Sequence, residues 1–368
     1  MLTRIVKVYI VPAAVFVSVV MGGGYGTGRE VVEFFTRYGL QGGLLGIGAA
    51  TVAFGLVLAA TYEFARVFRA YDYRAFFGRL IGPFWWLFEV LYLLLFLLVL
   101  GVVSSAAGNI LEQEFGIASS LGLGLMLLLV AGLVFFGREV LERILTLWSV
   151  GMYVIFLLYF VQVLQGSDAD MAATFRASEA TEGWLKGGLL YAMYNVALAP
   201  VLLFTTRSIS TRTEAVLSGV LTAIMVMLPA LLFHASYAVG YPEVLDQAVP
   251  NYWMIDQFAP DWLLVAFLAA LFGTLVETGA GLVHGFIERI EAVLKPGEDD
   301  GLGHLPRAAI AVVALGASGL LGSLGIISLI AQGYSALAVG FALVYVVPLL
   351  TVGVYRIVRG PGTQVETQ

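Results

Sequence analysis

The chain is a series of long apolar stretches separated by short polar segments. A helix needs roughly 20 consecutive apolar residues to cross the hydrocarbon core of a bilayer. Runs of this length predict about ten membrane-spanning helices, near residues 5–35, 40–65, 83–108, 118–136, 140–165, 184–206, 214–240, 260–287, 306–324 and 333–357. The first stretch is too long for one straight crossing, which favours a broken or tilted helix.

The composition excludes an ordinary soluble globular protein. Of the 368 residues, 60% are hydrophobic and 12% are charged, and the mean hydropathy is +0.94, whereas soluble domains carry about 25% charged residues. Cysteine, HExxH and GxSxG are absent, so we expect no disulfide, no enzyme and no catalytic residues. We expect the lipid bilayer and a small-molecule substrate as partners, and no nucleic acid; the oligomeric state is left open.

The basic residues predict the orientation in the membrane. If the N-terminus is cytoplasmic, only Arg37, Arg176 and Lys186 fall in outer loops, Arg29 lies within the first helix, and every other arginine and lysine lies on the cytoplasmic side. The excess of Lys and Arg in cytoplasmic loops therefore places both termini in the cytoplasm. We expect the cytoplasmic membrane of a prokaryote, and a disordered polar tail at residues 361–368.

Two predicted helices, five segments apart, are interrupted. The first carries five glycines in "GGGYGTG" (Gly22–Gly28), and the sixth carries Asn195 and Pro200 in "YAMYNVALAP". Freed backbone groups at membrane depth are tolerated only where they are buried in protein or line a cavity. Interruptions at matching positions predict two inverted five-helix repeats, residues 1–165 and 166–360. The alternative is a close-packing glycine surface and a tolerated proline kink.

The segment "GGGYGTGREVVEFF", and more weakly "GTLVETGAGLVHG" in the eighth predicted helix, resembles the amino acid–polyamine–organocation superfamily. Within that superfamily it is most similar to the YkvI-like membrane proteins. The resemblance implies an all-α membrane protein with the LeuT-type fold, a 5+5 inverted repeat with helices 1 and 6 interrupted. It also implies secondary transport of small molecules, many of them amino acids, coupled to Na⁺ or H⁺.

The resemblance also implies a substrate site at the two interruptions. Backbone N–H groups at the first break would hold a carboxylate, which glycine lets approach closely. The predicted substrate-binding residues are Gly26, Thr27, Gly28, Tyr191, Tyr194, Asn195, Val196 and Ser105. Ordinary packing is the alternative for the tyrosines, because the chain has 17 of them, and hydrogen bonding between helices is the alternative for Ser105.

A glutamate in the eighth predicted helix indicates an ion site. Glu277 follows a long apolar run, and a carboxylate there must be protonated, face a cation or pair with another buried group such as Arg29. The resemblance implies a Na⁺ site formed by the carbonyls of Gly22, Tyr25 and Thr274 and the side chains of Glu277 and Thr278. Because a glutamate stands where a hydroxyl is usual, H⁺ stays open as the coupling ion, and Na⁺ is favoured.

Three further polar residues are candidates for a gate or a proton relay. Arg29 and Glu30 follow the first break, and helical spacing predicts that Arg29 pairs with Glu33; an outer gate or a contact to an anionic ligand is the alternative. His284 is seven residues beyond Glu277, on nearly the same helix face. It is a candidate proton relay or a polar residue that lines the cavity.

These features together predict a secondary transporter that works by alternating access. We expect it to move an amino acid or a related carboxylate, coupled to Na⁺. An H⁺-coupled or uncoupled exchanger of the same fold, an ion channel and a non-transporting receptor are the alternatives. No cofactor other than the coupling ion is expected.

Overall fold

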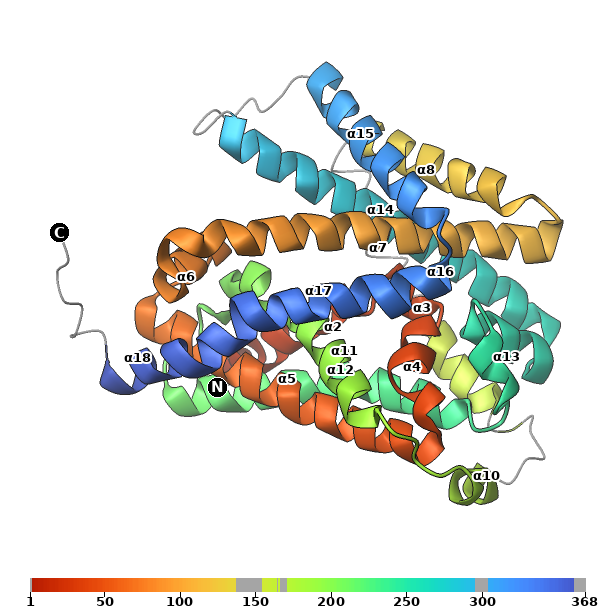
Figure 1. The fold of residues 1–368 in the computed structure, drawn as a ribbon, viewed down its shortest axis with the longest axis horizontal. Helices are drawn as coiled ribbons and strands as arrows, with labels where there is room; N and C mark the ends of the chain where they lie inside the picture. Colours follow the sequence, from red (N-terminus) through yellow and green to blue (C-terminus); the bar gives the residue numbers. More distant parts are fainter. Residues whose placement is uncertain (1, 137–153, 164, 166–170, 295–303, 361–368) are drawn as a thin grey trace.

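The computed structural model describes residues 2–136, 154–163, 165, 171–294 and 304–360, and their regular structure is entirely helical (Figure 1). The helices before residue 137 are α1 (Leu2–Ile5), η1 (Val6–Ile10), α2 (Val11–Val20), α3 (Gly23–Gly26), α4 (Arg29–Phe34), η2 (Thr36–Tyr38), α5 (Leu40–Phe68), α6 (Tyr73–Leu80), η3 (Gly82–Trp85), α7 (Trp86–Phe115) and α8 (Ser119–Phe136).

The later helices begin with Val154–Val163. They continue with α10 (Met171–Ala177), α11 (Trp184–Val196), η4 (Ala199–Thr206), α12 (Arg212–Ser236), η5 (Glu243–Asp246), α13 (Pro250–Phe258), α14 (Asp261–Leu294), α15 (His304–Gly322), α16 (Ile326–Ser328), η6 (Leu329–Tyr334), α17 (Ser335–Phe341), η7 (Ala342–Val346), η8 (Leu349–Gly353) and α18 (Val354–Arg359).

The predicted membrane character is confirmed. In the described residues, 6 helices are long and apolar enough to cross a bilayer: Thr3–Val20, Leu40–Phe68, Gly82–Phe115, Arg212–Ser236, Asp261–Ile287 and Ile326–Arg359. The pair α11 and η4 forms a further, bent candidate, and Ser119–Gly132, Val154–Val163 and Ala309–Gly322 are shorter apolar helices. Each predicted span overlaps one of these. The count of ten stays a prediction, because most of the predicted span 140–165 lies outside the described residues.

The helices pack as two groups. The first group is α2, α5, α11 and α12, in which α5 contacts α11 and α12; the second group is α7, α8, α14 and α15, in which α7 contacts the other three (Figure 1). Glycines allow the close approach within the first group: a Cβ on Gly188 of α11 would lie 2.3 Å from the carbonyl oxygen of Gly46 in α5. Backbones that touch in this way are typical of helix packing in membranes.

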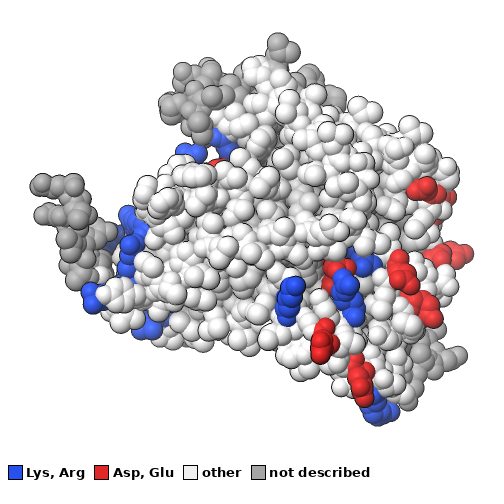
Figure 2. All heavy atoms as spheres, in the orientation of Figure 1, with Lys and Arg blue, Asp and Glu red and all other residues white. Residues whose placement is uncertain are grey.

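Charge is distributed unequally between the two ends of the molecule. Basic residues gather where α6 and α18 lie, and acidic residues gather at the opposite end, near α13 (Figure 2). The acidic end includes Glu112 and Glu114 at the end of α7. This separation has the form that the sequence predicted, although which end faces the cytoplasm stays a prediction.

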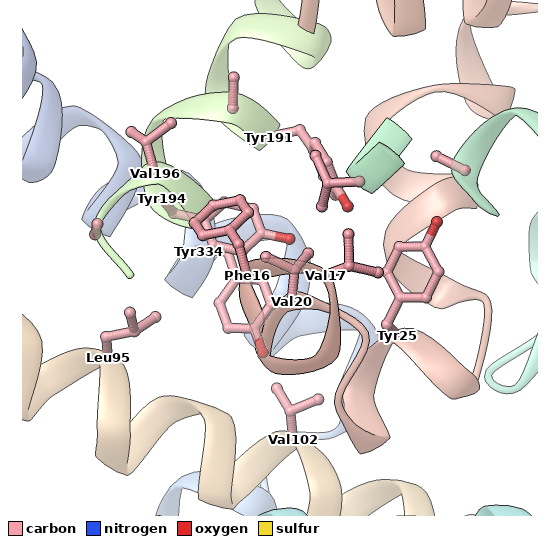
Figure 3. Packing of buried hydrophobic residues seen from close by; sticks show 14 of the residues in the cluster. Phe16, Val17, Val20, Tyr25, Leu95, Val102, Tyr191, Tyr194, Val196 and Tyr334 are labelled. Carbon is pink, nitrogen blue, oxygen red and sulfur yellow. The ribbon is translucent and has the colours of Figure 1, made fainter. Parts of the chain in front are cut away.

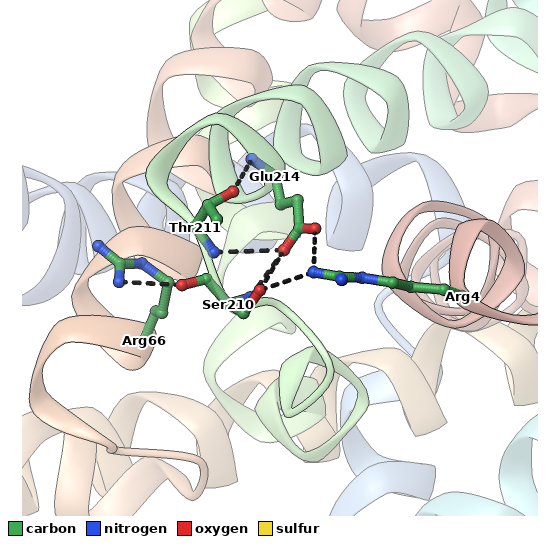
Figure 4. A network of polar contacts seen from close by, with 5 residues as sticks. All are labelled: Arg4, Arg66, Ser210, Thr211 and Glu214. Atoms are coloured by element: carbon green, nitrogen blue, oxygen red, sulfur yellow. Dashed lines mark hydrogen bonds and ion pairs between the residues drawn. The ribbon is translucent and has the colours of Figure 1, made fainter. Parts of the chain in front are cut away.

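A polar network joins helices of the first group at the basic end (Figure 4). Arg4 in α1 donates to Ser210 Oγ at 2.8 Å and pairs with Glu214 at 2.7 Å. Arg66, near the end of α5, donates to the carbonyl of Ser210 at 3.3 Å. Thr211 and Glu214 form a capping box that satisfies the first N–H groups of α12. The N-terminal helix, α5 and α12 are therefore tied together at this end.

Candidate functional site

The predicted interruption of the first helix is confirmed. The helix α2 ends at Val20, Gly22 is extended (φ −65°, ψ −176°), and α3 is a single turn. Gly28 has φ +81°, in the left-handed region that glycine adopts without strain. A Cβ on Gly28 would lie only 2.0 Å from Tyr237 Oη, so this position combines a special conformation with a close approach.

The predicted interruption between Asn195 and Pro200 is also confirmed. The helix α11 ends at Val196, η4 begins at Ala199, and the two are bent by 58°. Pro200 lies at the start of η4. The first turn of a helix does not use this N–H for an intrahelical hydrogen bond, so the missing donor and the fixed φ of proline destabilise the helix least there.

A cavity of about 360 Å³ lies at these two interruptions, within the range of about 300–1,000 Å³ that is usual for small-molecule sites. Its lining residues are Ser18, Val19, Val20, Gly22, Gly24, Tyr25, Glu30, Tyr92, Leu95, Phe96, Val99, Tyr194, Asn195, Leu198, Glu277, Thr278, Gly281, Leu282 and Tyr334. Both packing groups therefore contribute, together with α3, α4 and η6. The ring centroids of Tyr194 and Tyr334 lie 4.6 Å apart, and Figure 3 shows the two side chains close together.

Adjacent residues Arg29 and Glu30 point to different places. The Glu30 side chain is buried, lines the cavity and accepts a hydrogen bond from the Tyr194 hydroxyl. Arg29 instead pairs with Glu33 at 3.1 Å, as helical spacing predicted, and donates to the carbonyls of Leu245 at 2.7 Å and Gln247 at 3.0 Å. Arg29 therefore does not neutralise Glu30 by a direct contact.

The structure brings most of the predicted ion-site residues together. Gly22, Tyr25, Glu277 and Thr278 all line the cavity, and a Cβ on Gly22 would lie 3.3 Å from Thr278 Oγ1. Thr274 does not line it, and its hydroxyl donates to the carbonyl of Ala270 at 2.9 Å. The described residues hold no cluster of three or more His, Asp or Glu side chains placed to bind a metal ion. A cation here would need carbonyl and hydroxyl oxygens beside a carboxylate.

The prediction that the N–H groups of Gly26, Thr27 and Gly28 are free is wrong for this structure. They donate to the carbonyls of Gly22 (3.2 Å), Gly24 (3.3 Å) and Tyr25 (3.0 Å), because α3 forms a helical turn that uses them. The Thr27 hydroxyl likewise donates to the Gly24 carbonyl at 2.7 Å. None of the three residues lines the cavity.

The carbonyls of the same segment are covered from the acidic end. Asn251 donates from Nδ2 to the Gly26 carbonyl and from its backbone N–H to the Thr27 carbonyl, both at 3.0 Å. The Tyr237 hydroxyl donates to Asn251 Oδ1 at 2.6 Å and lies 3.4 Å from the carbonyl oxygen of Gly28. We call this set of contacts the outer seal, because the sequence predicts that this end faces outward.

The sixth-helix predictions divide into two kinds. Tyr194 and Asn195 line the cavity, and Asn195 also donates from Nδ2 to the carbonyl of Tyr191 at 3.1 Å. Tyr191 and Val196 are buried but lie outside the cavity lining. The Tyr191 ring packs 4.9 Å from the ring of Phe35, which fits the packing alternative.

Two other predicted residues lie away from the cavity lining. Ser105 is buried within α7, and His284 lies on α14 without lining this cavity or the one beside it. His234, in α12, is fully buried and bonds to Thr36 Oγ1 at 2.9 Å and to the Leu40 carbonyl at 2.8 Å. Those contacts describe a structural histidine.

A second cavity, of about 530 Å³, adjoins the first on the side of the basic end. Tyr92, Phe96, Gly281 and Leu282 line both. Beyond them, the guanidinium of Arg289 lies 4.1 Å from the centre of the Tyr92 ring. The two cavities therefore adjoin along these four shared residues.

Sequence reasoning missed several residues of the site. Tyr334 belongs to the π-helical segment η6, and its signal was the polar interruption "AQGYS" in the last apolar run. Tyr92 and Phe96 gave no signal, because they lie in the uninterrupted apolar part of α7 that follows Glu89. Asn251 lies in an outer connection whose contacts depend on the tertiary fold.

Comparisons with known proteins agree with a transporter fold. No family model matches the chain. It is similar to the uncharacterized membrane protein YkvI of Bacillus subtilis (strain 168), with 25% identity over 295 residues, 77% of this chain and 81% of that protein. In structure it is similar to the Eremococcus coleocola manganese transporter, with a TM-score of 0.53, 16% identity and coverage of 95% of this chain and 80% of that one.

A weaker structural similarity is to a Na⁺-coupled sialic acid symporter in a substrate-bound outward-open state, with a TM-score of 0.44, 12% identity and coverage of 96% and 86%. At these identities the comparisons show the fold alone. The chain thus resembles a YkvI membrane protein in sequence and LeuT-like transporters in fold. Membership of the amino acid–polyamine–organocation superfamily stays a prediction.

Proposed function

We propose that this protein is a secondary transporter that moves a small solute across the membrane by alternating access. The observation that carries the proposal is the cavity where the two interrupted helices meet, lined from both packing groups. Broken helices that surround a site between two helix groups are the arrangement on which alternating access depends.

The two packing groups supply the moving parts of this proposal. The network of Arg4, Arg66, Ser210 and Glu214 holds helices of the first group together, and α7, α14 and α15 pack closely in the second. The cavity lies between the groups, so rocking one against the other would change which end of the cavity is open. Bound solute and ion would bias the two states according to their affinity for each.

For the coupling ion we propose Na⁺, held by the carbonyls of Gly22, Tyr25 and Thr274 and the side chains of Glu277 and Thr278. Hard cations prefer oxygen ligands, and four of these residues surround the same cavity. H⁺ is the second candidate, favoured by the presence of both Glu30 and Glu277 in the lining. A manganese substrate, as named for the structural neighbour, has less support. The described residues hold no group of three or more His, Asp or Glu side chains that could bind a metal ion.

An amino acid or a related small solute fits the volume of the cavity. A carboxylate at Gly26–Gly28 would require those N–H groups to exchange their present partners. Opening of the outer seal, which holds the same segment through Asn251 and Tyr237, is the step at which we propose that this happens.

Counterflow in proteoliposomes tests the proposal. Proteoliposomes that contain the purified protein are loaded with an unlabelled amino acid mixture. Uptake of labelled amino acids into these vesicles is then followed with and without Na⁺. We expect saturable exchange that depends on the internal solute. Passive flux that never saturates would instead indicate a channel.

Glu277→Gln tests the coupling ion. Removing one partner of a largely desolvated charge pair costs about 2–5 kcal/mol, so we expect Na⁺ affinity to fall by at least about 30-fold and accumulation against a gradient to be lost. The readout is the Na⁺ dependence of uptake. Glu63→Gln is the matched control, because Glu63 is also buried but pairs with Arg66 away from the cavity. Unchanged Na⁺ dependence in Glu277→Gln would remove Glu277 from the ion site.

A further inference from the structure

Building on the transporter function proposed above, we propose that the transported solute carries a protonated amine and that Glu30 is the carboxylate that binds it. The inference names a substrate class and a specificity-determining residue. It differs from the role of gate or relay that the sequence suggested for Glu30.

The charges around the cavity favour a cationic solute. Glu30 and Glu277 both line it, and no lysine, arginine or histidine is among its lining residues in the described chain. The nearest arginine in sequence, Arg29, is committed to Glu33 and to two backbone carbonyls. An anionic solute would therefore lie in a poorly solvated site beside the Glu30 carboxylate, whose hydrogen bond comes from the neutral Tyr194 hydroxyl, and charge repulsion is strongest where the dielectric constant is low.

Two carboxylates on different elements allow two cations with separate roles. Glu30 lies on α4, whereas Glu277 lies on α14 and is followed by Thr278, whose hydroxyl approaches Gly22. Glu277, Thr278 and Gly22 line the same cavity, and their oxygen atoms are of the kind that suits a small inorganic cation. Glu30 has aromatic neighbours, which suit an organic one.

The cavity that Glu30 lines has an aromatic wall. Tyr25, Tyr92, Phe96, Tyr194 and Tyr334 all contribute to the lining, and ring faces attract ammonium groups through their quadrupole. The Tyr194 hydroxyl donates to Glu30 and so holds the carboxylate in place. The Tyr25 hydroxyl is buried without a hydrogen-bond partner among the described residues, so it remains able to accept a bond from an N–H group of a ligand.

Gly24 leaves room beside the carboxylate. A Cβ at this position would lie 3.2 Å from Glu30 Oε1 and 3.7 Å from Tyr334 Oη. A side chain there would crowd the carboxylate on the side of the broken helix. Charge, aromatic surface and free space thus meet at Glu30.

The test uses probes that differ only in their charged groups. Leucine, 3-methylbutan-1-amine and 4-methylpentanoate share a branched chain and carry both charges, only the amine or only the carboxylate; alanine, ethylamine and propionate form a smaller series. Putrescine and MnCl₂ are added as further cations. Each probe is tested by thermal shift on the full-length protein in detergent, with and without Na⁺, because a ligand of the folded state raises its apparent stability.

We expect the amines, and the amino acids through their ammonium group, to stabilise the protein, whereas the two deaminated acids do not. Glu30→Gln should weaken amine binding at least about tenfold, and Glu30→Asp, which keeps the charge, should restore part of it. Glu63→Gln, a buried carboxylate outside the cavity, should bind as the unmodified protein does.

Three results would overturn the inference. These are acids that bind as tightly as amines, amine binding that survives Glu30→Gln, and no stabilisation by any amine, a result that includes the case in which Mn²⁺ alone stabilises the protein. The transporter function fails in a different way. Amine binding with no counterflow would contradict transport and leave the amine site standing. Counterflow of a solute that lacks an amine would contradict the amine site and leave transport standing.

Discussion

The two ends of the cavity are closed to very different degrees. Towards the acidic end, Asn251 and Tyr237 bind the carbonyls of the first break, and Arg29 ties α4 to the carbonyls of Leu245 and Gln247. Towards the basic end, no comparable set of contacts separates the cavity from solvent in the described residues, and a second cavity of about 530 Å³ adjoins it. If the basic end is cytoplasmic, as the sequence predicts, this is the arrangement of an inward-facing state.

The contrast also shows what the broken helix contributes. A continuous helix would use the carbonyls of Gly26 and Thr27 in its own ladder, whereas here they accept from Asn251. The same break brings Gly22 against Thr278 on the cavity side. One interruption therefore supplies both a binding surface and the contacts that close it, which couples binding to closure.

The largest expected effect comes from Gly28→Ala, which attacks the outer seal directly. The new Cβ would meet Tyr237 Oη at 2.0 Å and Asn251 Oδ1 at 2.7 Å, in a backbone of positive φ. Left-handed strain of about 1–2 kcal/mol and overpacking of about 1–3 kcal/mol predict a loss of roughly 2–5 kcal/mol. The thermal unfolding midpoint in detergent measures it.

Gly116→Ala is the matched control for that substitution. Gly116 also has positive φ, at +64°, but a Cβ there meets nothing within 4 Å, so only the backbone strain of about 1–2 kcal/mol applies. The difference between the two variants isolates the packing of the seal. Equal losses would show that the seal contributes nothing beyond the conformation of Gly28.

The next effect is a shift between states caused by Asn251→Ala. This change removes the side-chain donor to the Gly26 carbonyl and the Oδ1 acceptor of the Tyr237 hydroxyl, at a cost of about 1–3 kcal/mol. A reporter thiol at Gly281→Cys measures the shift, because Gly281 lines both cavities, has open space at its Cβ, and the natural chain has no cysteine.

We expect the reporter to be labelled from the basic end, and the rate to fall roughly tenfold when Asn251→Ala destabilises the inward-facing state. Asn109→Ala is the control, because among the described residues the Asn109 side chain bonds only to the Ser105 carbonyl in its own helix. A rate that stays the same in both variants would mean that the outer seal does not control access at the other end.

The sequence predicted the arrangement of helices more completely than it predicted the contacts between side chains. Length and hydropathy located the apolar helices, and the rules for backbone in membranes located both interruptions, because these properties are local. The spacing of Arg29 and Glu33 likewise gave a pair that the structure confirms. The direction of Glu30 could not be predicted, because residues one position apart face different surroundings that only the packing of α4 defines.

The present hydrogen bonds of the N–H groups at Gly26–Gly28 could not be predicted for a related reason. The glycines predicted a break in the helix. They did not predict that a helical turn, α3, would form inside the break and use the N–H groups of Gly26–Gly28. Tyr191 and Ser105 lie outside the cavity lining, which the sequence could not show because an apolar pattern does not define how a helix is rotated about its axis. Which face of α7 meets the cavity depends on its contacts with α14 and α15.

Ser105→Ala gives the smallest expected effect and tests that rotation. Ser105 is buried in α7 and does not line the cavity, so ligand affinity should stay within about twofold, with a stability change of about 1 kcal/mol or less. Asn195→Ala, which alters a lining residue, should weaken the same ligand several times more. Thermal shift with the best amine probe compares the two. A larger loss at Ser105 than at Asn195 would mean that α7 turns Ser105 towards the solute in another state, and that the sequence-based prediction describes that state.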